Sequence, residues 1–145
     1  MSVEQIARDV VMNMGDEKKV SSMITADAMA SGGVLPGAIP MTEAFRLMSG
    51  LTMAFPDLSF DIQKVTVNGN QATVDVLWGG TNTGMFTLPI PGMPPIPATG
   101  KKVMVKDSYV VTVQGDKVSH FKAQSPADGG IPAALAQMGV NLPGM

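Results

Sequence analysis

The sequence has no cysteine, which excludes disulfide bonds, thiolate nucleophiles and cysteine-ligated metal sites. Charged residues make up only 15% of the 145 residues, and a net charge of −2 leaves no basic surface for nucleic acid. The single tryptophan and single tyrosine are not interleaved with basic residues, so a platform for stacking bases is missing too. We therefore expect no nucleic-acid partner.

Long apolar runs and metal-binding clusters are also scarce. No stretch of about eighteen apolar residues occurs, so we expect no helix that crosses a membrane. The N-terminal sequence MSVEQIARDVV contains Glu4 and Asp9 and lacks the basic segment and apolar core of a signal peptide. Because the absence of cysteine fits a reducing compartment, we expect a cytoplasmic location. With one histidine, a transition-metal site would need mostly carboxylates, so we expect no metal and no other cofactor.

The first third of the chain has the patterns of helices. Ser2 and Gln5 form an S-x-x-Q capping box, and the apolar residues after it repeat with the helical period until Gly15. Residues 21–30 are compatible with a second helix, and residues 34–40 are interpreted as a connector. A third helix is predicted to end before a proline at position 56, which cannot continue the hydrogen-bond ladder. Its apolar face consists of Ala44, Leu47, Met48, Leu51 and Phe55.

After Leu58 the apolar period changes to two, which is typical of strands. The predicted strands are residues 60–67, 72–78, 103–114 and 117–124. Two hairpin turns are predicted between them, because Asn and Gly accept the backbone angles that such turns require. The turn sequences are NGN at 68–70 and GD at 115–116.

Residues 79–103 are rich in glycine and proline, and we interpret them as a short strand at 85–88 followed by a proline-rich crossover at 89–100. A short closing helix is expected at residues 133–138. The order of helices, antiparallel strands and a final helix predicts an α+β fold in one domain over residues 1–145. In this fold, N-terminal helices pack on a curved, mostly antiparallel sheet and form a cone with an internal cavity.

Five short motifs occur along the chain: FPDL at 55–58, GTNTG at 80–84, TGK at 99–101, GDKV at 115–118 and LAQMG at 135–139. With these motifs, over roughly residues 40–139, the chain resembles the SnoaL-like polyketide cyclases of the nuclear transport factor 2-like superfamily, whose members are cystatin-like α+β cones. The resemblance implies a homodimer and cofactor-free proton-transfer chemistry.

Three positions differ from the pattern of that family, and one is a tryptophan near the end of the last strand, where Phe121 or Lys122 stands here. Asn82 stands in GTNTG where the family commonly has histidine. The family's last strand usually leads to an aspartate that acts as the acid or base of the characterised cyclases. Here the nearest acid after the strand is Asp128, which lies further along the chain and follows Pro126. By resemblance, Asp128 is a candidate catalytic residue and Asn82 a candidate ligand-binding residue.

Asp107 is the most informative candidate that the residues themselves indicate. It shares one face of the predicted strand 103–114 with Tyr109 and with the valines at 103, 105, 111 and 113. This face is the more apolar one, so both polar residues are expected to point inward. A carboxylate desolvated by apolar neighbours can serve as a general acid or base. The alternative is a structural ion pair with a lysine or arginine, or a position at a solvated cavity mouth.

His120 and Trp78 are two further candidates. His120 is the only histidine, and its unperturbed pKa lies near neutrality, so it could act in catalysis. Neither face of its strand is cleanly apolar, and a solvated or hydrogen-bonded structural histidine is the alternative. Trp78 could stack on a flat ligand, or it could be a core aromatic residue at the end of a strand.

These features predict a cone-shaped protein that binds an apolar small molecule in a cavity lined by methionine and valine. As an enzyme it would be a cofactor-free cyclase or isomerase acting on an apolar carbonyl compound. Asp107 or His120 would remove a proton alpha to the carbonyl, and Tyr109 or Asn82 would donate to the oxyanion. The alternative is a non-catalytic ligand-binding or dimerisation module, so the sequence leaves open whether the protein is an enzyme.

Overall fold

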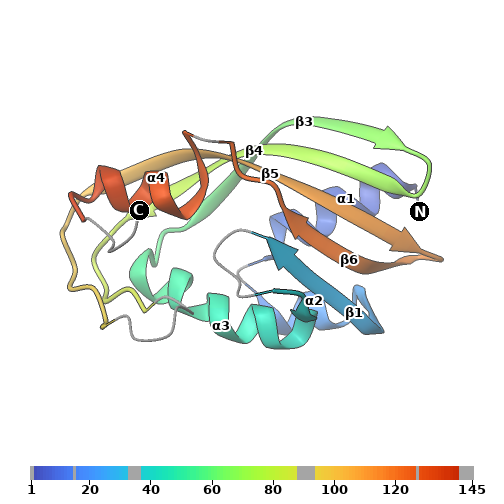
Figure 1. Cartoon of the computed structure of the whole chain (residues 1–145), viewed down its shortest axis with the longest axis horizontal. Helices are drawn as coiled ribbons and strands as arrows, with labels where there is room; N and C mark the ends of the chain where they lie inside the picture. Colours follow the sequence, from blue (N-terminus) through green and yellow to red (C-terminus); the bar gives the residue numbers. More distant parts are fainter. Residues whose placement is uncertain (1, 15, 33–36, 88–93, 127, 141–145) are drawn as a thin grey trace.

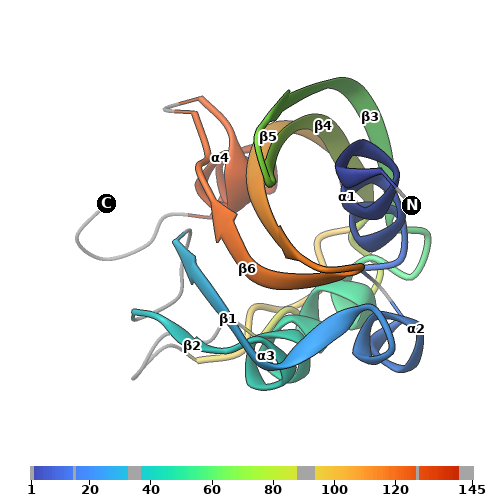
Figure 2. The same ribbon diagram turned by 90° about the vertical axis from the view of Figure 1, so that its right-hand side faces the viewer.

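A computed structural model of the chain describes residues 2–14, 16–32, 37–87, 94–126 and 128–140, apart from the side chains of residues 17 and 47–49. Its frame is a six-stranded mixed sheet in the order β2-β1-β6-β5-β4-β3. Figure 2 shows the sheet as a strongly curved wall with α1 inside the curve, and Figure 1 shows α1 and α4 at opposite ends of the sheet. The fold is therefore the predicted α+β arrangement of helices on a curved sheet.

Four consecutive strands form the antiparallel meander that the period-two pattern predicts. They are β3 (Ser59–Asn68), β4 (Gln71–Thr81), β5 (Lys102–Gln114) and β6 (Lys117–Ala123). Gly69 and Gly115 adopt positive φ angles of 63° and 66° in the two hairpin turns, a backbone conformation that glycine takes without steric cost. Both predicted turns are thus confirmed.

The predicted second helix over residues 21–30 is wrong. A single short helix, α2 (Glu17–Ser21), begins after Asp16, and the chain then forms strand β1 (Ile24–Gly32). β1 pairs in parallel with β6, and the segment expected as a connector supplies a second edge strand, β2 (Ile39–Pro40). Alanine and methionine give the segment a local helical preference, but pairing with β6 buries Ile24, Ala28 and Ala30 and outweighs it.

Helix α1 (Val3–Met12) begins at the predicted cap. The Ser2 hydroxyl accepts a hydrogen bond from the backbone N–H of Gln5, whereas the Gln5 side chain donates to Asp9 instead of returning to Ser2. Only half of the predicted capping box therefore forms. The inner face of α1 buries Ile6, Ala7, Val10 and Val11 against the sheet. Each large aliphatic side chain buried in this way stabilises the fold by about 1.5–3 kcal/mol. The predicted stop at Gly15 lies outside the described residues.

Helix α3 (Met41–Ala54) ends at the predicted place, and helix α4 (Gly130–Gln137) closes the chain. Ala44, Leu51 and Phe55 are buried as expected, while Leu47 and Met48 lie outside the side chains described. Of the strand predicted at 85–88, a single bridge between Phe86 and Ile96 is present, and residues 88–93 lie outside the described residues.

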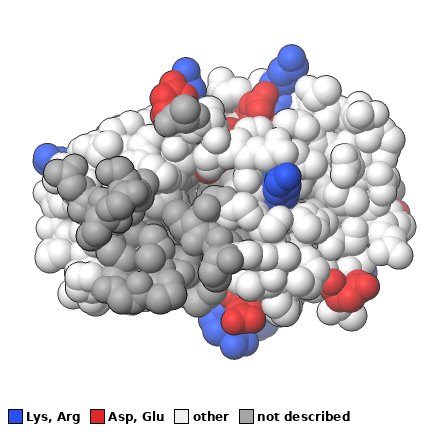
Figure 3. Space-filling model, viewed as in Figure 1, with Lys and Arg blue, Asp and Glu red and all other residues white. Residues whose placement is uncertain are grey.

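Charged side chains are sparse on the surface. On the face in Figure 3, lysine, arginine, aspartate and glutamate are scattered and do not gather into a patch of one sign. None of the helices in the described part of the chain combines the length and hydropathy needed to cross a membrane.

Candidate functional site

A cavity of about 470 Å³ opens between the concave face of the sheet, helix α3 and the start of helix α4. Its lining is mostly apolar, and α3 contributes Met41, Ala44, Phe45 and Leu51. Among the described residues that line it there is no lysine, arginine or histidine. Four lining residues are exposed and mark the opening: Gln124, Ser125, Pro126 and Pro132. The size is that of a small-molecule site.

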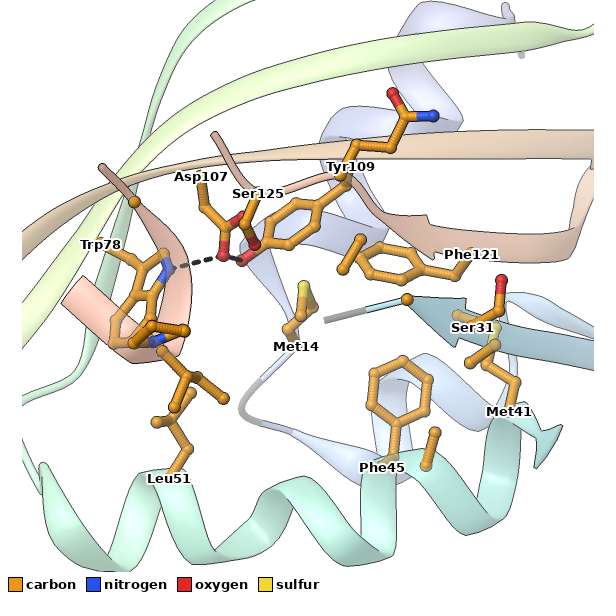
Figure 4. Close-up of a pocket in the computed structure, with 18 of the residues that line it drawn as sticks. Met14, Ser31, Met41, Phe45, Leu51, Trp78, Asp107, Tyr109, Phe121 and Ser125 are labelled. Carbon is orange, nitrogen blue, oxygen red and sulfur yellow. Dashed lines mark hydrogen bonds between the residues drawn. The ribbon is translucent and has the colours of Figure 1, made fainter. Parts of the chain in front are cut away.

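Methionines line the cavity as predicted, through Met14 and Met41, but none of the valines in the described part of the chain does. The inward valines of β5 are buried in the core because helices α1 and α4 pack against that strand. The expected valine lining is therefore wrong, and aromatic side chains take its place. Figure 4 shows how these residues surround the space.

Asp107 is the acidic residue of the cavity wall. The alternation of β5 turns it inward, and it is only 8% exposed. Trp78 Nε1 and the Tyr109 hydroxyl donate to its Oδ2 at 3.0 and 3.2 Å. The Ser125 hydroxyl and the backbone N–H of Ser108 donate to its Oδ1 at 2.7 and 2.9 Å. A carboxylate has about four acceptor sites, so the protein occupies all of them.

Tyr109 lies two residues further along the same face of β5, and its ring stacks at a tilt on Phe121, with 4.9 Å between centroids. Burial raises the pKa of the Tyr109 phenol well above its usual value of 10.0, and the charge of Asp107 and the hydrogen bond to it raise the pKa further. The phenol therefore stays protonated and remains a hydrogen-bond donor at neutral pH.

Trp78 is a core residue, as one of the two readings expects, and it also forms part of the cavity wall. It is buried on β4, and its ring makes edge contacts with Phe55 and tilted contacts with Phe60, as a core residue does. The indole N–H nevertheless points to Asp107 and the ring lines the cavity, as Figure 4 shows. One side chain thus supports the core and positions the carboxylate.

Ser125 is a site residue that sequence reasoning missed. It lies just after β6 at the cavity opening, and its hydroxyl reaches Asp107, which lies 18 positions earlier in the chain on β5. Gly129 holds this region close to β5, because a Cβ at this position would overlap the carbonyl oxygen of Lys106. No local signal marks a serine for such a contact.

His120 and Asp128 do not line the cavity, although Ser31, the hydrogen-bond partner of His120, does. On β6 the inward residue is Phe121, so His120 points to the opposite face of the sheet, where it shares a 2.9 Å hydrogen bond with the Ser31 hydroxyl. Asp128 is exposed over 74% of its side chain and lies 3.9 Å from Lys106. The structure therefore brings together Asp107, Tyr109 and Trp78. It places neither His120 nor Asp128 with them.

Asn82 is fully buried outside the cavity lining. Its Nδ2 donates to the carbonyl oxygens of Ala54 and Gly84, and its Oδ1 accepts from the backbone N–H and hydroxyl of Thr99. The side chain thus joins the end of α3 to the motifs GTNTG and TGK. Among the described residues, no group of three or more histidine, aspartate or glutamate side chains is arranged to hold a metal ion.

Comparison with known proteins gives both a fold and a family. The fold matches a candidate SnoaL-like polyketide cyclase from Jannaschia sp. CCS1, with 18% identity, a TM-score of 0.72, and 98% of this chain and 97% of that one covered. It also matches AclR, a candidate hydroxylase from Streptomyces galilaeus, with 17% identity, a TM-score of 0.72, and 99% and 86% covered. A third match is IdmH, a candidate polyketide cyclase from Streptomyces antibioticus, with 17% identity, a TM-score of 0.72, and 97% of this chain and 100% of that one covered.

A search among curated proteins gives no match. The sequence model of one family does match, and it spans residues 3–125, which include every strand of the sheet and the residues around Asp107. The predicted resemblance is confirmed: the chain belongs to the SnoaL-like polyketide cyclase family.

Proposed function

We propose that the cavity binds an apolar carbonyl compound and that Asp107 removes a proton alpha to its carbonyl group. The reaction would be an isomerisation or an intramolecular aldol ring closure without a cofactor. The observation that carries the proposal is a carboxylate, 8% exposed, on the wall of an apolar cavity of about 470 Å³ with three side-chain donors around it. Membership in a family of polyketide cyclases supports ring closure as the reaction class.

The proton and the electron pair can be followed step by step. Asp107 takes the proton, and the pair of the broken C–H bond moves into the carbonyl group and forms an enolate. In an isomerisation, Asp107 returns the proton to another carbon of the same conjugated system. In a ring closure, the enolate carbon attacks a second carbonyl group of the same molecule, and the resulting alkoxide receives the proton from Asp107.

Tyr109 is suited to stabilise the enolate. Because its pKa is raised, the phenol keeps its proton, and its single O–H, which donates to Asp107 in the free protein, can turn to the developing oxyanion once Asp107 has accepted the substrate proton and become a weaker acceptor. Trp78 has one N–H donor on the other side of Asp107, which is released from the carboxylate in the same way (Figure 4). Both donors come from the inward face of the sheet, so their positions are set before a ligand binds.

Proton transfer requires one donor to leave Asp107, because all of its acceptor sites are occupied. Ser125 is the donor best placed to do so, since it lies at the exposed opening and its hydroxyl rotates freely about one bond. A ligand entering there would displace the Ser125 hydroxyl from Oδ1 and receive its hydrogen bond. We therefore assign Ser125 a positioning role in the proposed reaction.

Deuterium exchange tests the proposal without knowledge of the natural substrate. The bicyclic ketone α-tetralone is incubated with the protein in D₂O, and incorporation at the carbon alpha to its carbonyl is followed by mass spectrometry. We expect catalysed exchange, slowed about a hundredfold or more in Asp107→Asn because a general base is lost. Circular dichroism verifies that the variant is folded.

Asp75→Asn is the matched control. Asp75 lies on the neighbouring strand β4, faces away from the cavity and accepts a hydrogen bond from Ser108. Its replacement removes the same charge from the same sheet and is expected to leave the exchange rate unchanged. Equal rates for wild type and a folded Asp107→Asn variant would rule out Asp107 as the base.

A non-catalytic binding module is the second candidate, and one observation favours it. Four protein donors occupy the acceptor sites of Asp107, as expected of a carboxylate with a structural role in the cavity wall. In that case wild type binds α-tetralone but catalyses no exchange. The expected homodimer and cytoplasmic location stay predictions, which sedimentation velocity and cell fractionation would test.

A further inference from the structure

The negative charge of Asp107 has no positive counterpart on the cavity wall. The described lining residues include no lysine, arginine or histidine, and the four donors to Asp107 are uncharged groups. Lys106, its neighbour on β5, faces the opposite side of the sheet and lies 3.9 Å from Asp128. A buried charge that only neutral groups solvate favours a cation in the adjoining space.

Aromatic rings surround the same space. Trp78 and Tyr109 lie on either side of Asp107, Phe121 packs on Tyr109, and Phe45 faces them from α3 (Figure 4). The faces of aromatic rings carry partial negative charge and attract cations, and the attraction grows when water is excluded. The aromatic rings and the carboxylate therefore both favour a positively charged ligand.

We propose that this cavity binds quaternary ammonium ions that carry an apolar group, with the cationic head beside Asp107 and the apolar group toward α3. The inference shares its site with the proposed function but does not depend on catalysis. A quaternary head suits this carboxylate better than a primary one. All acceptor sites of Asp107 are occupied, and a quaternary nitrogen has no N–H group that needs one.

Direct binding tests the inference, because the single tryptophan of the chain lies in the cavity wall. Three probes are titrated while Trp78 fluorescence is recorded: benzyltrimethylammonium, its uncharged carbon isostere 2,2-dimethylpropylbenzene, and benzylammonium. We expect saturable binding of the quaternary ion, and weaker binding of benzylammonium.

Three variants separate charge from shape. Asp107→Asn is expected to weaken the binding of benzyltrimethylammonium by about tenfold while leaving the uncharged isostere bound as well as before. Asp75→Asn, with the same charge change on the outer face of the sheet, should alter neither. Met14→Lys places a cation in the cavity lining and keeps Asp107, so it should abolish binding of the quaternary ion and retain the isostere. The Met14→Lys variant tests the inference even if Asp107→Asn fails to fold.

Three results would overturn the inference: no saturable change with the quaternary ion, an equal effect of Asp107→Asn on charged and uncharged probes, or unchanged affinity for the ion in Met14→Lys. The α-tetralone assay on the same preparations separates the two proposals. Exchange without ammonium binding overturns this inference alone. Ammonium binding without exchange overturns the proposed reaction alone.

Discussion

At the scale of single residues, Tyr109 and Asp107 form a hydrogen-bonded pair in the cavity wall. They are two positions apart on β5, so both turn inward, and the phenol donates to the carboxylate at 3.2 Å. Burial and the adjacent negative charge both disfavour the phenolate, and each raises the pKa of Tyr109. The protonation state of the Tyr109 hydroxyl therefore reports on its burial and on its hydrogen bond to Asp107.

The single tyrosine makes this pKa directly measurable. In the unfolded chain Tyr109 ionises near pH 10, whereas in the folded protein it stays protonated to higher pH. Above about pH 10 the unfolded state binds fewer protons than the folded state, so stability is fully present below that pH and is lost as pH rises toward the raised pKa. We expect tyrosinate absorbance to appear only together with unfolding, as followed by circular dichroism.

Asp107→Asn provides the comparison for this titration. Removing the carboxylate charge removes one cause of the shift, so the Tyr109 pKa should fall below its wild-type value while remaining above 10.0 because burial persists. Tyrosinate that forms in the folded wild-type protein at about pH 10 would contradict the buried hydrogen-bonded geometry.

At the scale of elements, the corner between α3 and β3 depends on Asp57. Its Oδ1 accepts a hydrogen bond of 2.7 Å from the backbone N–H of Thr81, at the end of β4. This bond is the largest cause that lowers the pKa of Asp57 below 3.8, and Lys102 adds a smaller contribution. The side chain thus connects the helix-to-strand turn to the neighbouring strand.

Asp57→Asn should destabilise the protein at neutral pH, with a difference that disappears in acid. The folded-state pKa is depressed, so the stabilisation is present above the unfolded pKa of about 3.9 and is lost as pH falls through the folded pKa. Urea unfolding monitored through Trp78 fluorescence at several pH values measures this difference in the free energy of unfolding between wild type and variant. Asp27→Asn, an exposed position on β1, is the control, and a difference that persists at low pH would refute the assignment.

At the scale of the whole molecule, the sheet and the helices share one set of buried residues. Trp78 on β4 contacts Phe55 at the end of α3, with ring centroids 6.4 Å apart. Phe55 in turn contacts Phe86 in the loop between β4 and β5, with centroids 5.8 Å apart. Helix α1 packs against β3, β4, β5 and β6. A unit connected in this way is expected to unfold cooperatively.

The prediction of one domain over residues 1–145 can be tested on this basis. Urea transitions recorded by Trp78 fluorescence, which reports on the sheet and α3, should coincide with those recorded by far-ultraviolet circular dichroism, which reports on all elements. Two separated transitions would show that part of the chain forms an independent unit.

Local sequence determined the meander, both of its hairpin turns, the ends of α3 and the inward orientation of Asp107 and Tyr109. These features follow from side-chain period and from backbone angles, which depend on neighbours a few residues away. The motifs around Asn82 were recognisable through the resemblance to the family, but the sequence could not tell that the Asn82 side chain makes four hydrogen bonds to protein groups.

Only the tertiary structure decided the rest. Residues 24–32 form a strand because β6, nearly a hundred positions later, offers a parallel partner that buries their apolar face. Ser125 enters the site and His120 turns away from it through the same pairing, since the register between β1, β5 and β6 selects which side chains face the cavity. Contacts between distant segments leave no periodic trace in the sequence, and two of the four donors to Asp107, Trp78 and Ser125, come from such segments.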